Sequence, residues 1–169
     1  MKIDSSNLKL HVLRTFFSHN FSSRLRCRCA FWIGMVSDRS VRFGKDIFIE
    51  NPYKVKVGSG SFINNGVHIY TGVHNSSLVI IGNNVGIGLD SCIVTNSHHI
   101  GASNKRWAED YSESITIEDG VWIGANVTVL PGVTIKKGGV IAAGAVVTES
   151  TEPNAVYAGI PARKIRDLS

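Results

Sequence analysis

The apolar residues of this chain recur at every sixth position over more than half of its length. Counting in steps of six from Val57 to Val147, twelve of the sixteen positions are Ile or Val. Ile and Val make up only 36 of the 169 residues, so about three would fall there by chance. The twelve positions are Val57, Ile63, Ile69, Ile81, Ile87, Ile93, Ile117, Ile123, Val129, Ile135, Ile141 and Val147.

A six-residue period fits neither a helix nor an uninterrupted strand. Six residues turn an α-helix by about 600°, so the same face does not return, and a plain strand alternates with period two. A short β-segment followed by a bend does fit, since Gly, Asn, Asp and Lys are frequent between the apolar positions. Three such segments close into one coil, and stacked coils form an all-β parallel β-helix. The period does not fix its hand, for which right-handed crossovers are the general rule.

Breaks in the repeat predict excursions from this solenoid. Three successive positions of the repeat carry other residues than Ile or Val, namely His99, Lys105 and Tyr111. Residues 99–114 are therefore predicted to leave the solenoid as a loop. Asn75 breaks the repeat alone and predicts a smaller bulge. Such excursions often build the binding face of a repeat protein. The predicted organisation is a basic helical or irregular segment over residues 1–40, the β-helix over 41–155 and a C-terminal tail over 156–169. Coils before Val57 are expected out of phase.

The first 45 residues are strongly basic. They hold nine of the 18 basic residues and only two acidic ones, which predicts either a surface for an anionic membrane or acidic glycan, or a plain solvated face. Residues 5–17 have apolar residues near helical spacing and predict an amphipathic helix. Two roles remain open for it: covering the unpaired strand edges of the first coil, or lying on a membrane surface.

The cysteines and the N-terminus bear on location. Three cysteines are too few for a disulfide framework, and Cys27 and Cys29 form a lone C-x-C without a second pair. Arg14 interrupts the early apolar stretch, so no secretory signal is visible. We therefore expect a cytoplasmic protein with reduced thiols, possible contact with the inner membrane face through the basic segment, and no nucleic-acid partner.

Three segments of the second half resemble a known family. Residues 120–135 are GVWIGANVTVLPGVTI, residues 142–148 are AAGAVVT and residues 158–163 are AGIPAR. Together they resemble the hexapeptide-repeat O-acetyltransferases, above all the galactoside and maltose acetyltransferase group and its relatives that acetylate bacterial surface polysaccharides. The resemblance covers roughly residues 57–167. It implies a left-handed β-helix, acetyl-CoA as co-substrate, a carbohydrate acceptor, and a homotrimer with active sites between neighbouring subunits.

The resemblance also implies functional residues. It places the catalytic histidine at His98 rather than His99, and an acidic residue near it at Glu109. The implied contacts with acetyl-CoA are Asn64, Trp122, Ala125, Ala143, Thr148, Arg163 and Arg166. Two positions depart from the family: Glu149 stands where a lysine is frequent, and Gly72 lies nearest to the place of an aspartate that holds the sugar in galactoside enzymes. The N-terminal segment also lacks that group's helical substrate-binding module, so a simple galactoside or maltose is not the expected acceptor.

Acetyl transfer to an alcohol needs a base, because a sugar hydroxyl is almost never ionised at neutral pH. A neutral imidazole can take the proton while the oxygen attacks the thioester carbon, which is worth roughly 10²–10⁴ in rate. Transfer is then direct, so Cys92 is not needed as a nucleophile and is interpreted as a packing residue. Glu109 has two open interpretations, an orienting partner of His98 or a solvated loop carboxylate. Basic residues near the C-terminus suit the phosphates of CoA, and backbone amides could stabilise the oxyanion.

Other functions are weighed against this one. His68 and His74 raise the possibility of a metal site like that of carbonic anhydrases with this architecture, but the H-x₄-H pair of those enzymes is absent, so no metal is expected. The alternatives are an N-acetyltransferase of an amino sugar nucleotide and a non-catalytic assembly protein built of the same repeats.

Overall fold

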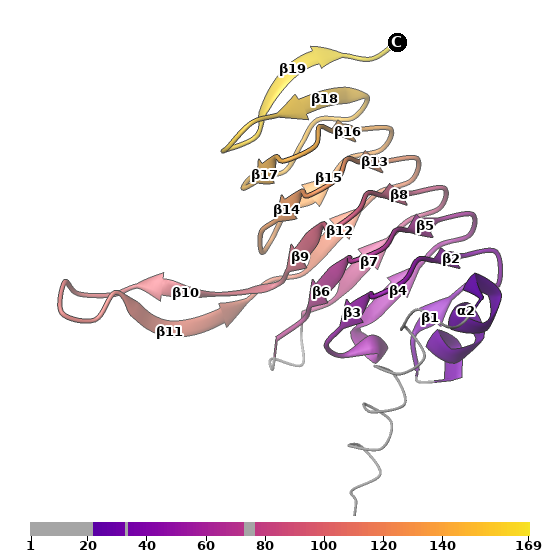
Figure 1. Ribbon diagram of the computed structural model, residues 1–169. Coiled ribbons are helices and arrows are strands. Elements are labelled where there is room, and N and C mark those ends of the chain that lie inside the picture. The colour runs from indigo at the N-terminus through magenta and orange to yellow at the C-terminus, as the bar shows by residue number, and fades with distance from the viewer. Residues whose placement is uncertain (1–21, 33, 73–76) are drawn as a thin grey trace, which may run out of the picture.

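The computed structural model describes residues 22–32, 34–72 and 77–169. Most of its strands are short and lie in three sheets, which the chain visits in the fixed order A, B, C (Figure 1). Sheet A contains β1 (Val36–Ser37), β4 (Val55–Val57), β7 (Val79–Ile81), β12 (Ile115–Ile117) and β15 (Thr134–Ile135). Sheet B contains β2 (Arg42–Phe43), β5 (Phe62–Ile63), β8 (Gly86–Ile87), β13 (Trp122–Ile123), β16 (Val140–Ile141), β18 (Ala155–Ala158) and β19 (Arg163–Asp167). Sheet C contains β3 (Phe48–Ile49), β6 (His68–Tyr70), β9 (Cys92–Val94), β14 (Thr128–Val129) and β17 (Val146–Val147).

The strand register explains why the six-residue repeat holds where it does. In the upper coils the parallel partners are 18 residues apart, as for Trp122 and Val140, so one coil is three repeats. In sheet B the spacing is 36 residues from Gly86 to Trp122, 24 from Phe62 to Gly86 and 20 from Arg42 to Phe62. The residues in excess of 18 in these coils always lie where the chain passes from sheet C back to sheet A. An excess of 6 or 18 residues is a multiple of six and keeps the phase of the six-residue repeat. The two extra residues beside the 3₁₀ turn η1 (Pro52–Lys54) shift the first coil out of that phase, as expected.

The repeated Ile and Val residues form the core of the solenoid. All twelve predicted positions are buried, none more than 4% exposed. The side chains that precede them by two residues are smaller, for example Ser61, Val85 and Ala145, and are buried as well. Each buried side chain stacks on its equivalent one coil away, because parallel partners such as Ile123 and Ile141 occupy the same place in successive coils. The predicted core is therefore confirmed.

The large excursion is an ordered hairpin rather than a loop. It consists of β10 (Asn96–Ile100) and β11 (Trp107–Ser112), which pair antiparallel and project from the corner between sheets C and A (Figure 1). It begins at Asn96, three residues before the predicted start at His99. A segment that leaves the solenoid loses the neighbouring coils as hydrogen-bond partners, so its two halves pair with each other instead. The predicted bulge around Asn75 falls largely outside the described residues.

A helix covers the first coil. The helix α2 (Ser23–Trp32) packs against β1 and β2 at the opposite end of the solenoid from the C-terminus (Figure 1). Arg26 is only 5% exposed, and its Nε donates a hydrogen bond of 3.0 Å to the carbonyl of Phe43. Burial lowers the pKa of Arg26 from its usual value, an effect that Asp46 opposes. The helix predicted at residues 5–17 lies outside the described residues, and α2 provides cover at this end, where β1, from Val36, pairs with β4.

The C-terminal tail closes the other end. Its first strand, β18, continues sheet B in parallel with β16, and β19 then folds back antiparallel on β18. The tail shows no six-residue pattern because only one of its strands adds to a coil. The result places Arg163 and Arg166 on the last strand of sheet B.

Candidate active site

His98 is held by a backbone carbonyl of the hairpin. Its Nδ1 lies 3.1 Å from the carbonyl oxygen of Ala108, on the partner strand. A carbonyl oxygen only accepts hydrogen bonds, so Nδ1 must carry the proton. The neutral ring then keeps its lone pair on Nε2, the nitrogen that a general base needs. The edge of the ring meets Trp107, with the ring centres 5.9 Å apart, and the side chain is exposed. His98 is therefore oriented as a base while its reactive nitrogen stays accessible.

The neighbouring candidates differ from His98 in orientation. His99 stacks on Tyr111, with ring centres 4.7 Å apart and planes inclined by 27°. The register pairs His98 with Asp110 and then shifts before Ile100 and Trp107, so Glu109 lies in this irregular stretch and not directly across from His98. Since the Ala108 carbonyl already orients the ring, this arrangement favours the second interpretation of Glu109, a solvated carboxylate.

A chain of hydroxyl groups fixes the base of the hairpin. Ser77 Oγ donates to the carbonyl of Thr71 at 3.0 Å, and Ser112 Oγ lies 2.7 Å from Ser77 Oγ. Thr95 Oγ1 is 3.3 Å from Ser112 Oγ. Ser112 Oγ has one proton and two acceptors within reach, Ser77 Oγ and, at 3.1 Å, the carbonyl of Thr95. When it donates to Ser77, the closer of the two, the chain runs from Thr95 through Ser112 and Ser77 to the Thr71 carbonyl. Thr71, Ser77 and Thr95 are fully buried. The chain ties both ends of the hairpin to the preceding excursion, only three residues from His98.

Removing a link of this chain tests its role in positioning His98. For Ser112→Ala we expect kcat for acetyl transfer to fall roughly tenfold, because losing a buried hydrogen bond costs about 1–3 kcal/mol, with an unchanged KM for acetyl-CoA. Ser61→Ala is the matched control, since its buried hydroxyl donates to Gly82 O and accepts from Val85 N far from the hairpin. Steady-state kinetics of both variants decide the matter. A fall in kcat of the same size in the Ser61 variant would assign the effect to general destabilisation.

Most of the residues expected to contact acetyl-CoA lie near the corner between sheets B and C, whereas Thr148 follows β17 on the side of sheet C that turns back toward sheet A. Ala125 and Ala143 occupy the corner between sheets B and C in successive coils, where Gly144 N donates to Ala125 O at 2.9 Å. Trp122 precedes this corner, and its side chain on the outer face of sheet B is 62% exposed. Asn64 lies at the same corner two coils lower, and its Oδ1 accepts a hydrogen bond from Asn65 N. Thr148 is exposed directly after β17. The corner is thus lined by small residues beside one exposed indole.

Among the basic residues of the tail, two are free of carboxylates. Lys164 lies 2.6 Å from both Glu152 and Asp167, and these hydrogen bonds, above all the one to Asp167, raise its pKa. The guanidinium groups of Arg163 and Arg166 donate to the backbone carbonyls of Ala162 and Asp167, and within residues 22–32, 34–72 and 77–169 neither arginine forms an ion pair. The two arginines therefore keep their charge available for phosphate, whereas Lys164 does not.

This difference predicts unequal effects on acetyl-CoA. For the double variant Arg163→Gln with Arg166→Gln we expect the KM for acetyl-CoA to rise roughly 10–100-fold, because charge-assisted hydrogen bonds to phosphate are lost. Lys164→Gln serves as the control and should change this KM less than about twofold, since exposed ion pairs contribute little. The measurement is the KM at several salt concentrations. Equal effects of the two changes would contradict the assignment.

One chain does not bring the two groups of candidates together. His98 stands on the hairpin at the corner between sheets C and A, whereas Ala125 and Ala143 line the corner between sheets B and C. Strands β10 and β11 pack chiefly against each other, and the hairpin points away from the solenoid (Figure 1). The base and the predicted cofactor edge are therefore separated within a single subunit.

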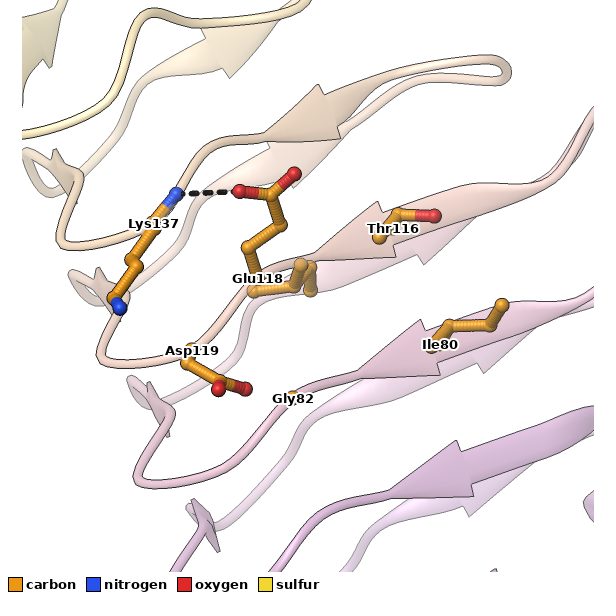
Figure 2. A pocket seen from close by; sticks show the side chains of 7 residues that line it. Ile80, Gly82, Thr116, Glu118, Asp119 and Lys137 are labelled. Atoms are coloured by element: carbon orange, nitrogen blue, oxygen red, sulfur yellow. Dashed lines mark hydrogen bonds between the residues drawn. The ribbon is translucent and has the colours of Figure 1, made fainter.

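An open groove of about 320 Å³ lies elsewhere, on sheet A and its corner with sheet B. Figure 2 shows the Glu118 carboxylate beside the backbone N of Lys137 in the neighbouring coil, which donates a hydrogen bond of 2.9 Å to it, while the Lys137 side chain points away from this carboxylate. The Lys136 ammonium, at 3.0 Å, is the main cause that lowers the pKa of Glu118. The groove is lined by Ile80, Gly82, Thr116, Ile117, Glu118, Asp119 and Lys137. None of the predicted site residues is among them, so the groove is not the candidate active site.

Three features of the described part of the chain concern thiol, metal and membrane chemistry. Burial raises the pKa of Cys92, which keeps its thiol protonated and agrees with a packing role. No three His, Cys, Asp or Glu residues there lie close enough to hold a metal ion; His68 contacts Phe48 and Tyr70 instead, and His74 is outside the described residues. No helix in that part is long and apolar enough to cross a membrane.

Comparisons with known proteins agree with this geometry. A family model described as "Bacterial transferase hexapeptide (six repeats)" matches residues 114–149. Galactoside O-acetyltransferase of Escherichia coli (strain K12) is 32% identical over 171 residues, covering 99% of this chain and 81% of that protein. A hexapeptide-repeat acetyltransferase of Vibrio cholerae O1 biovar eltor, solved with acetyl-CoA, superposes with a TM-score of 0.83 at 26% identity, covering 98% of this chain and 91% of that one. A maltose O-acetyltransferase from Clostridium difficile 630 superposes with a TM-score of 0.80 at 28% identity, covering 98% of this chain and 90% of that one.

Three parallel sheets built from six-residue repeats define a hexapeptide-repeat β-helix protein. The chain belongs to the hexapeptide-repeat acetyltransferase family, of the galactoside and maltose O-acetyltransferase type. Membership makes it an acetyl-CoA-dependent O-acetyltransferase with a left-handed parallel β-helix. The predicted fold class, the family resemblance and acetyl-CoA as co-substrate are thereby confirmed, while the individual site residues, the acceptor and the homotrimer stay predictions.

Some features of the site have no signal in the sequence. The carbonyl of Ala108 and the hydroxyl chain through Ser77 and Ser112 depend on contacts between distant residues. The aromatic residues Trp107 and Tyr111, typical of strands, were the available sign that residues 99–114 form a hairpin.

Proposed function

We propose that this O-acetyltransferase moves the acetyl group of acetyl-CoA to a sugar hydroxyl by direct transfer, with His98 as general base. The observation that carries the proposal is the 3.1 Å contact between Nδ1 of His98 and the Ala108 carbonyl, which leaves Nε2 as the proton acceptor. Exposure of the side chain leaves that nitrogen accessible to a substrate.

The proposed reaction balances without a covalent enzyme intermediate. Nε2 of His98 takes the proton of the acceptor hydroxyl while its oxygen forms a bond to the thioester carbonyl carbon. The resulting oxyanion collapses, the carbon–sulfur bond breaks, and the imidazolium returns the proton to the leaving thiolate. The products are an acetyl ester and free CoA. Ala125, Ala143, Trp122, Asn64 and Thr148 would line the path of the cofactor. Arg163 and Arg166 would meet its phosphates.

We further propose that the working site forms between subunits of a homotrimer. Ile100 is 87% exposed and Trp107 64% exposed on the hairpin, which is a large apolar surface for a projecting arm. A neighbouring copy that covers this surface would bring His98 to the cofactor edge of the next chain. Such an arrangement accounts for the separation of the two groups of residues in a single subunit.

For the acceptor we propose a sugar of a bacterial surface polysaccharide or its precursor. Arg28, Arg39 and Lys45 are exposed near the first coil, and together with the basic residues before them they would attract an acidic glycan or lipid-linked intermediates at an anionic membrane.

An acceptor panel tests the proposed function. Acetyl-CoA is supplied with oligosaccharides of surface glycans and, separately, with amino sugar nucleotides, and the release of free thiol is followed. We expect turnover with hydroxyl acceptors. Turnover only with amino acceptors would indicate the N-acetyltransferase alternative. No acetyl-CoA binding and no turnover would indicate the non-catalytic one.

A further inference from the structure

The outer face of sheet B carries a row of side chains that the reaction described above does not fully use. Parallel register places Arg42, Phe62, Gly86, Trp122 and Val140 side by side on successive strands. Neighbouring strands are about 4.8 Å apart, so Phe62 and Trp122 stand roughly 10 Å from each other with Gly86 between them. The row therefore has an aromatic residue on each side of a position without a side chain.

Nothing in the fold requires glycine at position 86. Its backbone is not in the left-handed region, and an added Cβ would meet nothing nearer than Trp122 Cδ1 at 3.8 Å, an ordinary contact. Glycine inside a strand is unfavourable by about 0.5–1 kcal/mol relative to alanine. A strand glycine that neither conformation nor crowding explains is typical of a place where a ligand approaches the backbone closely.

Arg42 adds charge to one side of this gap. It is exposed, and its Cζ lies 5.4 Å from the centre of the Phe62 ring. In the part of the chain that the structure describes, no carboxylate pairs with it. A cation held over an aromatic ring beside an open slot suits an anionic group on whatever lies in the slot.

Most of the predicted cofactor residues lie on one side of this row. Ala125, Ala143, Arg163 and Arg166 lie at Trp122 or beyond it toward β19, whereas Phe62 and Arg42 lie on the opposite side of Gly86, where Asn64 at the corner after Phe62 is the one predicted cofactor contact. A site where the acetyl group passes from one substrate to the other needs the acceptor next to the cofactor. The slot fulfils this condition because Trp122 borders both.

We propose that an acceptor sugar ring lies over Gly86 between Phe62 and Trp122, with an anionic group of the acceptor bound by Arg42. The inference rests on the proposed function and specifies its substrate class: a glycan containing a carboxylate or another acidic group, not a neutral glycoside. Its apolar ring face packs on the aromatic side chains, and the guanidinium selects the charge.

Filling the slot is the first test. We expect Gly86→Ala and Gly86→Leu to fold, with melting temperatures unchanged or raised, while the KM for the acceptor rises, by roughly tenfold or more for the leucine variant, and the KM for acetyl-CoA stays the same. Thr116→Leu places the same leucine side chain on the outer face of sheet A and is the control, with both KM values unchanged. An unchanged acceptor KM in folded Gly86→Leu overturns the proposal.

The charge preference is the second test. Uronate-containing oligosaccharides are compared with their carboxyl-reduced forms as acceptors. Wild type should prefer the acidic form at least about tenfold in kcat/KM, Arg42→Gln should lose that preference, and Arg42→Lys should keep part of it. If wild type acetylates both forms equally, the O-acetyltransferase function stands and this inference fails. If wild type acetylates no sugar at all, the proposed function itself fails.

Discussion

Replacing His98 by alanine is expected to lower the rate of acetyl transfer by roughly 10²–10⁴, the usual contribution of a positioned general base. The ring is exposed, and its hydrogen bond is to a carbonyl of the hairpin, so the solenoid loses no packing. The melting temperature and the affinity for acetyl-CoA should therefore stay close to those of wild type. Thiol release, thermal unfolding and CoA binding measured on the same preparation check the three expectations.

Two further variants separate the base from its surroundings. His98→Asn keeps an N–H that can donate to the Ala108 carbonyl but has no nitrogen to accept a proton, so it should be as inactive as His98→Ala. His99→Ala removes the ring that stacks on Tyr111 and should retain most of the activity. Near-normal turnover of His98→Asn would refute the role of His98 as base.

The second large effect is expected for stability, in Gly88→Ala. A Cβ at Gly88 would lie 2.5 Å from Gly124 O and 2.6 Å from Ala125 N, which are backbone atoms of the next coil. Backbone cannot rotate away as a side chain can, so the coils must separate at this corner and their hydrogen bonds lengthen. We expect a loss of about 1–3 kcal/mol or more, seen as a lower melting temperature.

Gly86→Ala, two residues earlier, is the matched control for this stability effect. It makes the same chemical change, yet its Cβ on the outer face of sheet B would meet only Trp122 Cδ1, at an ordinary contact distance of 3.8 Å, and it should melt at or above the wild-type temperature. Equal melting temperatures for the two variants would show that the coil spacing at Gly88 is not tight. The pair thus compares a glycine needed for close packing with one whose absent side chain leaves room for a ligand.

Much of the fold could be predicted because its information is local. Each short strand places one Ile or Val inside at a fixed place, as Ile123 and Ile141 do, and every coil buries its own residues against the next. The excursion was harder to predict. The residues of β10 and β11 are mostly exposed, so the two strands have no regular pattern of buried positions along the sequence. Only cross-strand pairing, such as that of His98 with Asp110, defines them.

The candidate site was predictable only in part for the same reason. Motifs around Trp122 and Ala143 occur within contiguous repeats and can be recognised in the chain. The orientation of His98 depends on a carbonyl ten residues away, and the free charge of Arg166 depends on Lys164 having taken both nearby carboxylates. No spacing along the sequence records such choices.

The sequence by itself determined a solenoid of six-residue repeats, because side-chain burial every sixth residue is a property of consecutive residues. Its contiguous motifs carried the resemblance to the acetyltransferase family. The tertiary structure decided the rest. It placed the surplus residues at one corner, folded the largest surplus into a hairpin, chose the protonated nitrogen of His98 and left a gap at Gly86. These features arise from contacts between residues that are distant in the sequence, and such contacts form only when the chain folds.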